Sequence, residues 1–174
     1  MVLSIFNNRT KQFRWKERTS MKKIASFTVN HNILQPGVYV SRVDGDAVTY
    51  DLRMKKPNAG SYITPKSLHT IEHLLATYVR NSSYTDQVIY AGPMGCRTGF
   101  YLIMRDSVSK AEVLSLLRKT FAYIAAFEGE IPGNKKEECG NYLEHDLETA
   151  KQDAADYLQV LQQVTVDSFQ YPEA

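Results

Sequence analysis

The stretch SLHTIEHLLATYVRN, residues Ser67–Asn81, has the spacing of an amphipathic helix. Its apolar side chains recur three and four positions apart, which predicts a stripe that packs against a core. The members of that stripe are Leu68, Ile71, Leu75 and Val79. Just upstream, Thr64 and Pro65 predict where the helix begins, because threonine is a frequent N-cap and proline is tolerated at the first helical position. We therefore expect one helix that is anchored in the core by one face.

The segments around this helix predict an antiparallel sheet. Residues Gly37–Met54 are expected to form a hairpin that turns at Asp44–Asp46, because Asp-Gly-Asp is a turn signal between two β-rich runs. The runs QVIYA (87–91) and GFYLIMRD (99–106) predict two further strands, separated by the tight turn GPMGC. Residues Lys22–Val29 alternate between polar and apolar and predict another strand. Short turns between neighbouring strands imply antiparallel pairing.

Two more helices are expected towards the C-terminus. Ser109 and Glu112 have the spacing of a capping box, which predicts a helix that continues to about Phe127. A last helix is expected from about Tyr142 to Val164. Helices that pack on an antiparallel sheet give an α+β fold class, and we expect a single domain.

The composition is that of one soluble domain. The chain has 174 residues, of which 43% are hydrophobic and 23% charged. No apolar run approaches the roughly 18 residues of a membrane span, and the N-terminus lacks the features of a secretory signal. The first twenty residues carry a net charge of +4 and the rest of the chain −2, so the domain itself gives no indication of nucleic-acid binding. We interpret residues 1–20 as a disordered extension or a mis-assigned start, and residues 21–174 as the domain.

The chain has two cysteines, Cys96 and Cys139. They allow one disulfide, but in a chain without an export signal we expect free thiols with chemical or metal-binding roles, and a cytoplasmic location. Cys96 lies in the glycine-rich turn GPMGCRTGF, where the adjacent Arg97 would stabilise a thiolate that acts as an acid or base. The alternative is a turn cysteine without a role.

Two histidines of the opening stretch suggest a metal site. His69 and His73 lie four residues apart, so a helix presents both imidazoles to one ion, with Glu72 beside them. This is the reverse of the usual zinc-protease pattern; the alternative is two ordinary helix histidines near a surface glutamate. A catalytic metal needs a third protein ligand, and Cys139 in the polar loop KKEECGN is one candidate. A thiolate with two imidazoles suits zinc or ferrous iron. The competitors for the third position are His31, His145, Glu144 and Glu148.

Five ordered motifs resemble the S-ribosylhomocysteine lyases, the LuxS family of autoinducer-2 synthesis, over residues 21–165. These motifs are SFTVNH (26–31), YDLR (50–53), HTIEHLLATYVRN (69–81), GPMGCRTGFYL (92–102) and ECGNYLEHDLETAK (138–151). The resemblance implies that His69, His73 and Cys139 bind the metal, with ferrous iron as the native ion and zinc or cobalt as substitutes. It also implies that Glu72 and Cys96 are the catalytic acid and base.

The same resemblance implies the substrate and the assembly. S-Ribosylhomocysteine would be cleaved to homocysteine and 4,5-dihydroxy-2,3-pentanedione by carbonyl migration along the ribose and β-elimination of the thioether. Arg53, Ser26 and His31 would bind this substrate, with Ser26 and His31 supplied by the neighbouring subunit of a homodimer. No nucleic acid or membrane partner is expected. The chain departs from the family at Tyr90, where an acidic residue is common, so polar support of the cysteine turn from that position is not expected.

Two other functions fit the helix motif. A metallopeptidase with His-x-x-Glu-His would use a distant glutamate such as Glu148 as its third ligand, but it leaves both cysteines without a role. A non-catalytic structural site would need four protein ligands, so His31 or His145 would have to complete the set. The pair His145–Asp146 fits the resemblance, and we expect it at a helix start or beside the metal ligands.

Overall fold

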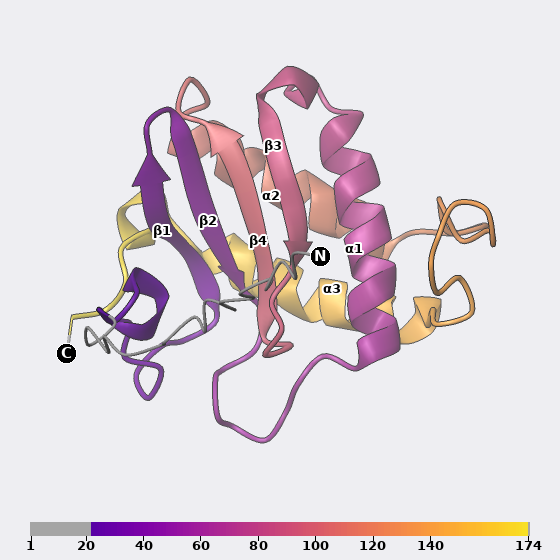
Figure 1. Ribbon diagram of the computed structural model, residues 1–174, viewed down its shortest axis with the longest axis horizontal. Helices are drawn as coiled ribbons and strands as arrows, with labels where there is room; N and C mark the ends of the chain where they lie inside the picture. Colours follow the sequence, from indigo (N-terminus) through magenta and orange to yellow (C-terminus); the bar gives the residue numbers. More distant parts are fainter. Residues whose placement is uncertain (1–21, 174) are drawn as a thin grey trace, which may run out of the picture.

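The computed structural model describes residues 22–173, which form one sheet and three α-helices (Figure 1). The four strands are antiparallel in the order β1-β2-β4-β3. They are β1 (Gly37–Asp44), β2 (Ala47–Arg53), β3 (Val88–Pro93) and β4 (Gly99–Arg105). The expected α+β class is thus confirmed. The predicted extension, residues 1–20, lies outside the described residues and stays a prediction. Among the described residues, no helix is long and apolar enough to span a membrane.

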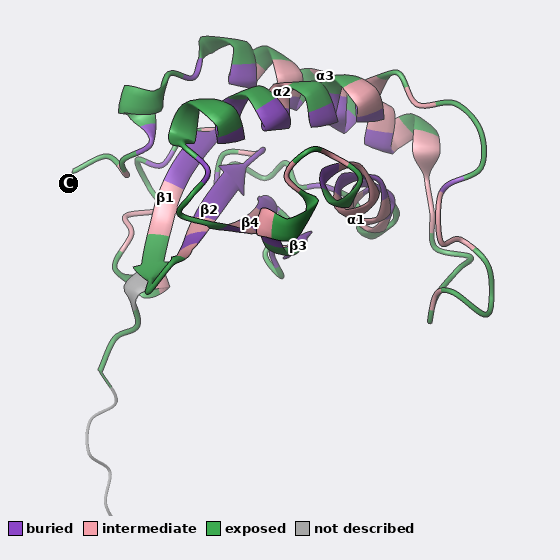
Figure 2. Cartoon of the chain, turned by 90° about the horizontal axis from the view of Figure 1, so that it is seen from above, coloured by how far each residue is buried: buried purple, intermediate pink, exposed green. Residues whose placement is uncertain are grey.

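Two of the three helices form a layer on one side of the sheet, and the third flanks its β3 edge. Helices α2 (Lys110–Ala125) and α3 (Leu147–Gln163) lie across one face, and α1 (Pro65–Arg80) runs beside β3 and contacts both of them (Figure 2). The core between these layers is built from alternate strand residues and the apolar sides of the helices. Its largest fully buried side chains include Tyr50, Phe100, Phe121, Tyr157 and Phe169.

Helix α1 begins and packs as predicted. The Thr64 hydroxyl accepts a hydrogen bond from the backbone N–H of Ser67, and Pro65 occupies the first turn. Ile71, Leu75 and Val79 are fully buried, whereas Leu68 is only partly buried. The histidine face of the helix is therefore held rigidly by the packing of the opposite face.

Two other local predictions are confirmed in substance. The hairpin turns after Asp44, with Gly45 at a φ of 60°, a conformation that glycine adopts without strain. The capping box at Ser109 and Glu112 is present at the start of α2. This helix ends at Ala125, two residues before the predicted end at Phe127.

Two predictions of secondary structure are wrong. Residues Lys22–Val29 form a short 3-10 helix at Ala25–Phe27, not a strand. The outer edge of β1 is already occupied by the C-terminal segment, since the Val40 N–H donates to the Phe169 carbonyl at 2.7 Å. A strand without a partner would leave its backbone groups unpaired.

The start of α3 is the second correction. The helix begins at Leu147 and not near Tyr142, because the Asp146 carboxylate accepts the N–H of Thr149 and caps it there. Asp146 is therefore at a helix start, as expected. The residues before it remain in the loop, where they contribute to the site described below.

Candidate active site

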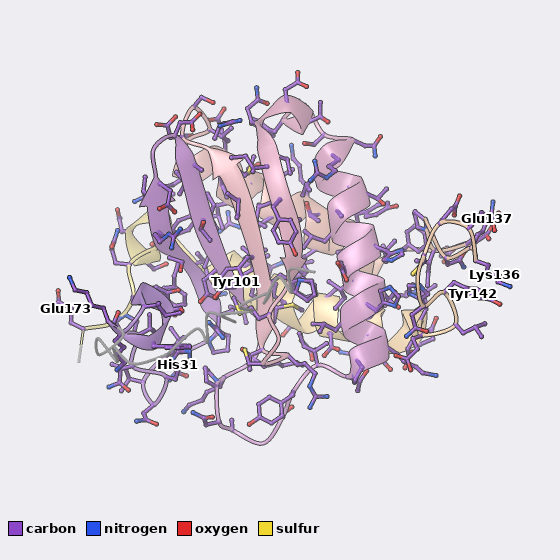
Figure 3. All side chains as sticks on the ribbon, viewed as in Figure 1. His31, Tyr101, Lys136, Glu137, Tyr142 and Glu173 are labelled. Carbon is purple, nitrogen blue, oxygen red and sulfur yellow. The ribbon has the colours of Figure 1, made fainter. Side chains whose placement is uncertain are left out.

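Four side chains that could bind a metal ion converge between α1 and the loop that precedes α3. His69, His73, Cys139 and His145 each offer a ligand atom, and these atoms lie within 4.8 Å of one another. The loop lies on the far side of α1 from the sheet, and Figure 3 labels Lys136, Glu137 and Tyr142 on it. The structure thus brings together the three residues predicted as metal ligands. Both cysteines are free thiols, as expected.

Backbone carbonyls of the loop fix the orientation of the two α1 histidines. His69 Nδ1 lies 3.0 Å from the Glu144 carbonyl, and His73 Nδ1 lies 2.8 Å from the Pro132 carbonyl. A carbonyl only accepts, so each Nδ1 carries the proton and each Nε2 keeps a free lone pair. His69 Nε2 is 3.4 Å from the Cys139 sulfur. The geometry fits a metal held by two imidazoles and a thiolate.

The loop has the backbone needed for this approach. Gly133 has a φ of 73°, and a Cβ atom there would lie 3.2 Å from His73 Nδ1, so glycine lets the loop close on the helix. Cys139 is tied by its N–H to the Lys135 carbonyl at 2.9 Å. The Asn141 N–H in turn donates to the Cys139 sulfur at 3.4 Å.

His145 joins the cluster in a different way. Its ring lies parallel to that of His69, with centroids 4.2 Å apart and planes inclined by 20°. A ligated imidazole holds its metal near the ring plane, and two rings stacked face to face cannot both do so for one ion. Burial, and then the nearby His69 and His73, lower the pKa of His145 to about 4, so it is neutral at pH 7. This arrangement favours three protein ligands over the four of a closed structural site.

The predicted substrate-binding residues lie together in a separate pocket. Ser26, His31, Arg53 and Cys96 line one cavity of about 300 Å³ on the side of the sheet opposite α2 and α3. Figure 3 shows His31 and Tyr101, two of its walls, well apart from the loop beyond α1. The other lining residues are Phe27, Val29, Asp51, Pro93, Met94, Gly95, Tyr101 and Tyr171.

Arg53 is the cation that faces Cys96. It donates to the Asp51 carboxylate and to the Thr98 hydroxyl, each at 2.5 Å, and its guanidinium lies 3.9 Å from the Cys96 sulfur. Arg97, which we expected in this role, lies over the ring of Tyr62 at 5.9 Å from its centroid. The reason is the turn itself, which holds Arg97 at a φ of 58°.

The Arg53 ion pair is buried on both sides. The Arg53 and Asp51 side chains are only 4% and 1% exposed. Burial would lower the pKa of Arg53, but the Asp51 carboxylate outweighs it, so the guanidinium stays charged. Burial raises the pKa of Asp51, and Arg53 and the Tyr171 hydroxyl oppose that shift. A charged donor is therefore fixed beside the thiol.

Within one chain the two groups of residues do not meet. The lining of the pocket includes neither Glu72 nor any residue of the metal-binding cluster. Helix α1 lies between the loop and the sheet in both views (Figures 1 and 2). The resemblance implied that Ser26 and His31 lie on the subunit opposite Glu72 and the metal, and it did not say which subunit supplies Cys96. Here all three line one pocket of the same chain.

Sequence reasoning missed the residues that support the predicted ones. Asp51 lies two positions from Arg53 on β2, a spacing that puts both on one face of the sheet and could have indicated the pair. The carbonyls of Pro132 and Glu144 and the ring of Tyr171 leave no recognisable pattern in the sequence.

Comparisons with known proteins agree with the geometry. A family model described as LuxS, S-ribosylhomocysteinase, matches residues 24–167. An S-ribosylhomocysteine lyase of Phocaeicola vulgatus is 48% identical over 158 residues, covering 87% of this chain and 98% of the relative. One of Clostridium acetobutylicum is 48% identical and covers 88% and 100%, and one of Borreliella burgdorferi is 44% identical and covers 87% and 100%. All the site residues predicted from the sequence lie within the matched range.

Proposed function

Because the chain belongs to the LuxS family of S-ribosylhomocysteinases, we propose that it cleaves S-ribosyl-L-homocysteine to L-homocysteine and 4,5-dihydroxy-2,3-pentanedione, the precursor of autoinducer-2. The enzyme is a carbon–sulfur lyase of that family. One observation carries this function most strongly. The cluster of His69, His73 and Cys139 lies within the matched range and offers two imidazole nitrogens and a sulfur to one ion.

A metal ion is proposed at His69, His73 and Cys139. The donor set supports ferrous iron as the native ion, with zinc or cobalt as substitutes, because thiolate and imidazole ligands suit these metals. When bound, the ion supplies a Lewis acid that polarises a carbonyl oxygen of the substrate. Three protein ligands would leave a coordination position open for the substrate.

Two side chains would move the protons. Each step of carbonyl migration takes a proton from one ribose carbon and returns one to its neighbour. The β-elimination removes the proton next to the ketone, breaks the carbon–sulfur bond and releases the homocysteine thiol, with no water consumed. Cys96 and Glu72 are proposed as the acid and base for these transfers. Arg53, Ser26 and His31 would bind and orient the substrate.

We further propose a homodimer in which the pocket of one protomer completes the metal centre of its partner. The separation of Cys96 and Arg53 from the metal-binding cluster by α1 supports this assembly. Apolar side chains near the pocket also support it, since Ile24 is 55% exposed and Phe27 65% exposed in the described chain. In this arrangement Ser26 and His31 face the metal site of the other chain, as the resemblance implies. Cys96 and Arg53 line the same pocket and therefore face that metal site too.

The two rival functions are less well supported. Glu148, the glutamate that a metallopeptidase would need as a ligand, is 87% exposed and lies outside the cluster. A closed structural site would need His145 as a fourth ligand, and its stacking on His69 opposes that role. A cytoplasmic location is proposed from the two free thiols.

Thiol release from S-ribosylhomocysteine by purified protein, with metal analysis of the same sample, tests the proposed function. We expect stoichiometric homocysteine formation that is lost in Cys96→Ala and kept in Glu148→Ala. Absence of thiol release from protein with one metal ion per chain would contradict the lyase. If Glu148→Ala instead loses both its activity and its bound metal, Glu148 is a metal ligand, as in the peptidase-like arrangement.

A further inference from the structure

The C-terminal segment wraps around the outer edge of the sheet. The Phe169 carbonyl accepts the Val40 N–H of β1, and the Phe169 ring is fully buried on the helix side, edge-on to Tyr50. Phe169 has a φ of −76° and a ψ of 6°, and Gln170 lies in a bend, so the chain turns here and passes the edge of the sheet. Tyr171 lies on the other face, where it stacks on Tyr39 with ring centroids 5.0 Å apart and planes inclined by 18°.

Tyr171 reaches the pocket from there. Its hydroxyl donates to Asp51 Oδ2 at 2.8 Å, the same oxygen that accepts the Arg53 guanidinium. Burial and the Asp51 carboxylate raise the pKa of Tyr171, so the hydroxyl keeps its proton and remains a donor. The family match ends at residue 167, before this tyrosine.

We propose that Tyr171 is a positioning residue for the pocket. It holds Asp51, Asp51 holds Arg53, and Arg53 faces the Cys96 sulfur and the substrate space. The inference rests on the proposed function for its catalytic consequence, but the link between Tyr171 and Asp51 is independent of it.

The surroundings of Asp51 make the Tyr171 hydroxyl more than a packing contact. The Asp51 carboxylate is buried and its Oδ1 has no hydrogen-bond partner among the described residues, so Oδ2 receives the stabilising donors. Removing one of them favours the protonated acid, which no longer pairs with Arg53. The acidic limb of catalysis should therefore move to higher pH when the hydroxyl is lost. The titratable groups that face Asp51 are Arg53, His31, Tyr39, Tyr101, Tyr157 and Tyr171.

The test compares Tyr171→Phe, which keeps the stacked ring, with Tyr123→Phe on the distant side of α2 as a control. We expect Tyr171→Phe to raise the pKa of the Asp51 carboxyl, followed by ¹³C NMR. We expect kcat/KM to fall by on the order of tenfold, mostly through KM, with the acidic limb shifted upward. Deletion of residues 171–174 removes Tyr171, keeps the Phe169 carbonyl in a peptide bond to Gln170, and should give the same shifts. Tyr123→Phe should change none of them.

The outcomes separate this inference from the proposed function. An unchanged Asp51 pKa in Tyr171→Phe overturns the link. A raised Asp51 pKa with an unchanged pH profile of kcat/KM overturns the positioning role. If the unmodified protein releases no thiol, the lyase proposal fails, and the NMR titration alone decides whether Tyr171 controls the Asp51–Arg53 pair.

Discussion

The His145 imidazole lies face to face with that of His69, and the hydroxyl of Thr70 fixes its orientation. Thr70 Oγ1 donates to the Lys66 carbonyl at 2.9 Å, so towards His145 Nδ1, 3.2 Å away, it acts as an acceptor. His145 Nδ1 then carries the proton, and Nε2 is a buried lone pair with no partner among the described residues. His145 is thus a neutral imidazole beside the proposed metal ligands, and its stacking on His69 opposes a role as a fourth ligand.

This relationship predicts how metal binding responds to substitution. Cys139→Ala should lose the metal together with activity, since it removes one of the three proposed ligands. His145→Ala should keep one ion per chain and bind it about 10- to 100-fold more weakly, as for residues that support a ligand. Metal analysis and chelator competition measure both effects. Equal loss in the two variants would mean that His145 is a fourth ligand.

Glu72→Gln is expected to separate chemistry from metal binding. The substitution keeps the size of the side chain and removes its ability to take up a proton, so turnover should fall by at least about 100-fold with the metal content unchanged. Steady-state kinetics and metal analysis of one preparation test this. Loss of the metal would show that Glu72 supports the cluster and does not act on the substrate.

The identity of the metal should set the sensitivity to oxidants. Ferrous iron with an open coordination position should make the enzyme lose activity in air or peroxide, whereas the zinc and cobalt forms should resist. Inactivation rates of the three forms give the comparison. Mass spectrometry of Cys96 must accompany them, because oxidation of this thiol also inactivates. Equal rates with Cys96 still reduced would contradict the iron proposal.

The Asp146 cap should contribute to stability in a pH-dependent way. Asp146→Ala is expected to lower the free energy of unfolding by about 1 kcal/mol at pH 7, and Asp146→Ser should keep most of it. Hydrogen bonds from the Thr149 side chain and backbone lower the pKa of Asp146 below 3.8. Its contribution is therefore present above pH 3.8 and is lost as the pH falls through the lowered value. Urea unfolding at pH 7 and pH 3 measures this; a constant difference between the wild type and Asp146→Ala would contradict it.

Sequence patterns predicted the parts of the fold that depend on near neighbours. The stripe and N-cap of α1, the capping box of α2 and the pair His69 and His73 follow from spacings within one or two turns. The strand predicted at Lys22–Val29 was wrong because the edge of β1 is occupied by Phe169, which lies more than a hundred residues away in the sequence. Cys139 as the third ligand came from the family resemblance, since spacing alone left several candidates open. The bond between Tyr171 and Asp51 spans 120 positions and has no local signature.

Mixed dimers test the central claim, that the active site combines the pocket of one chain with Glu72 and the metal of the other. His31→Ala and Glu72→Gln, each nearly inactive alone, are mixed and reassembled, with subunit exchange verified by mass tags. Random exchange makes half of the dimers mixed, and one site in each is then free of both substitutions, so activity should recover to about a quarter of wild type. Mixing Cys96→Ala with Glu72→Gln should restore activity to the same extent as the first pair. His31→Ala with Cys96→Ala should recover nothing, because both residues belong to one pocket. No recovery in the first two pairs despite verified exchange would contradict the shared site.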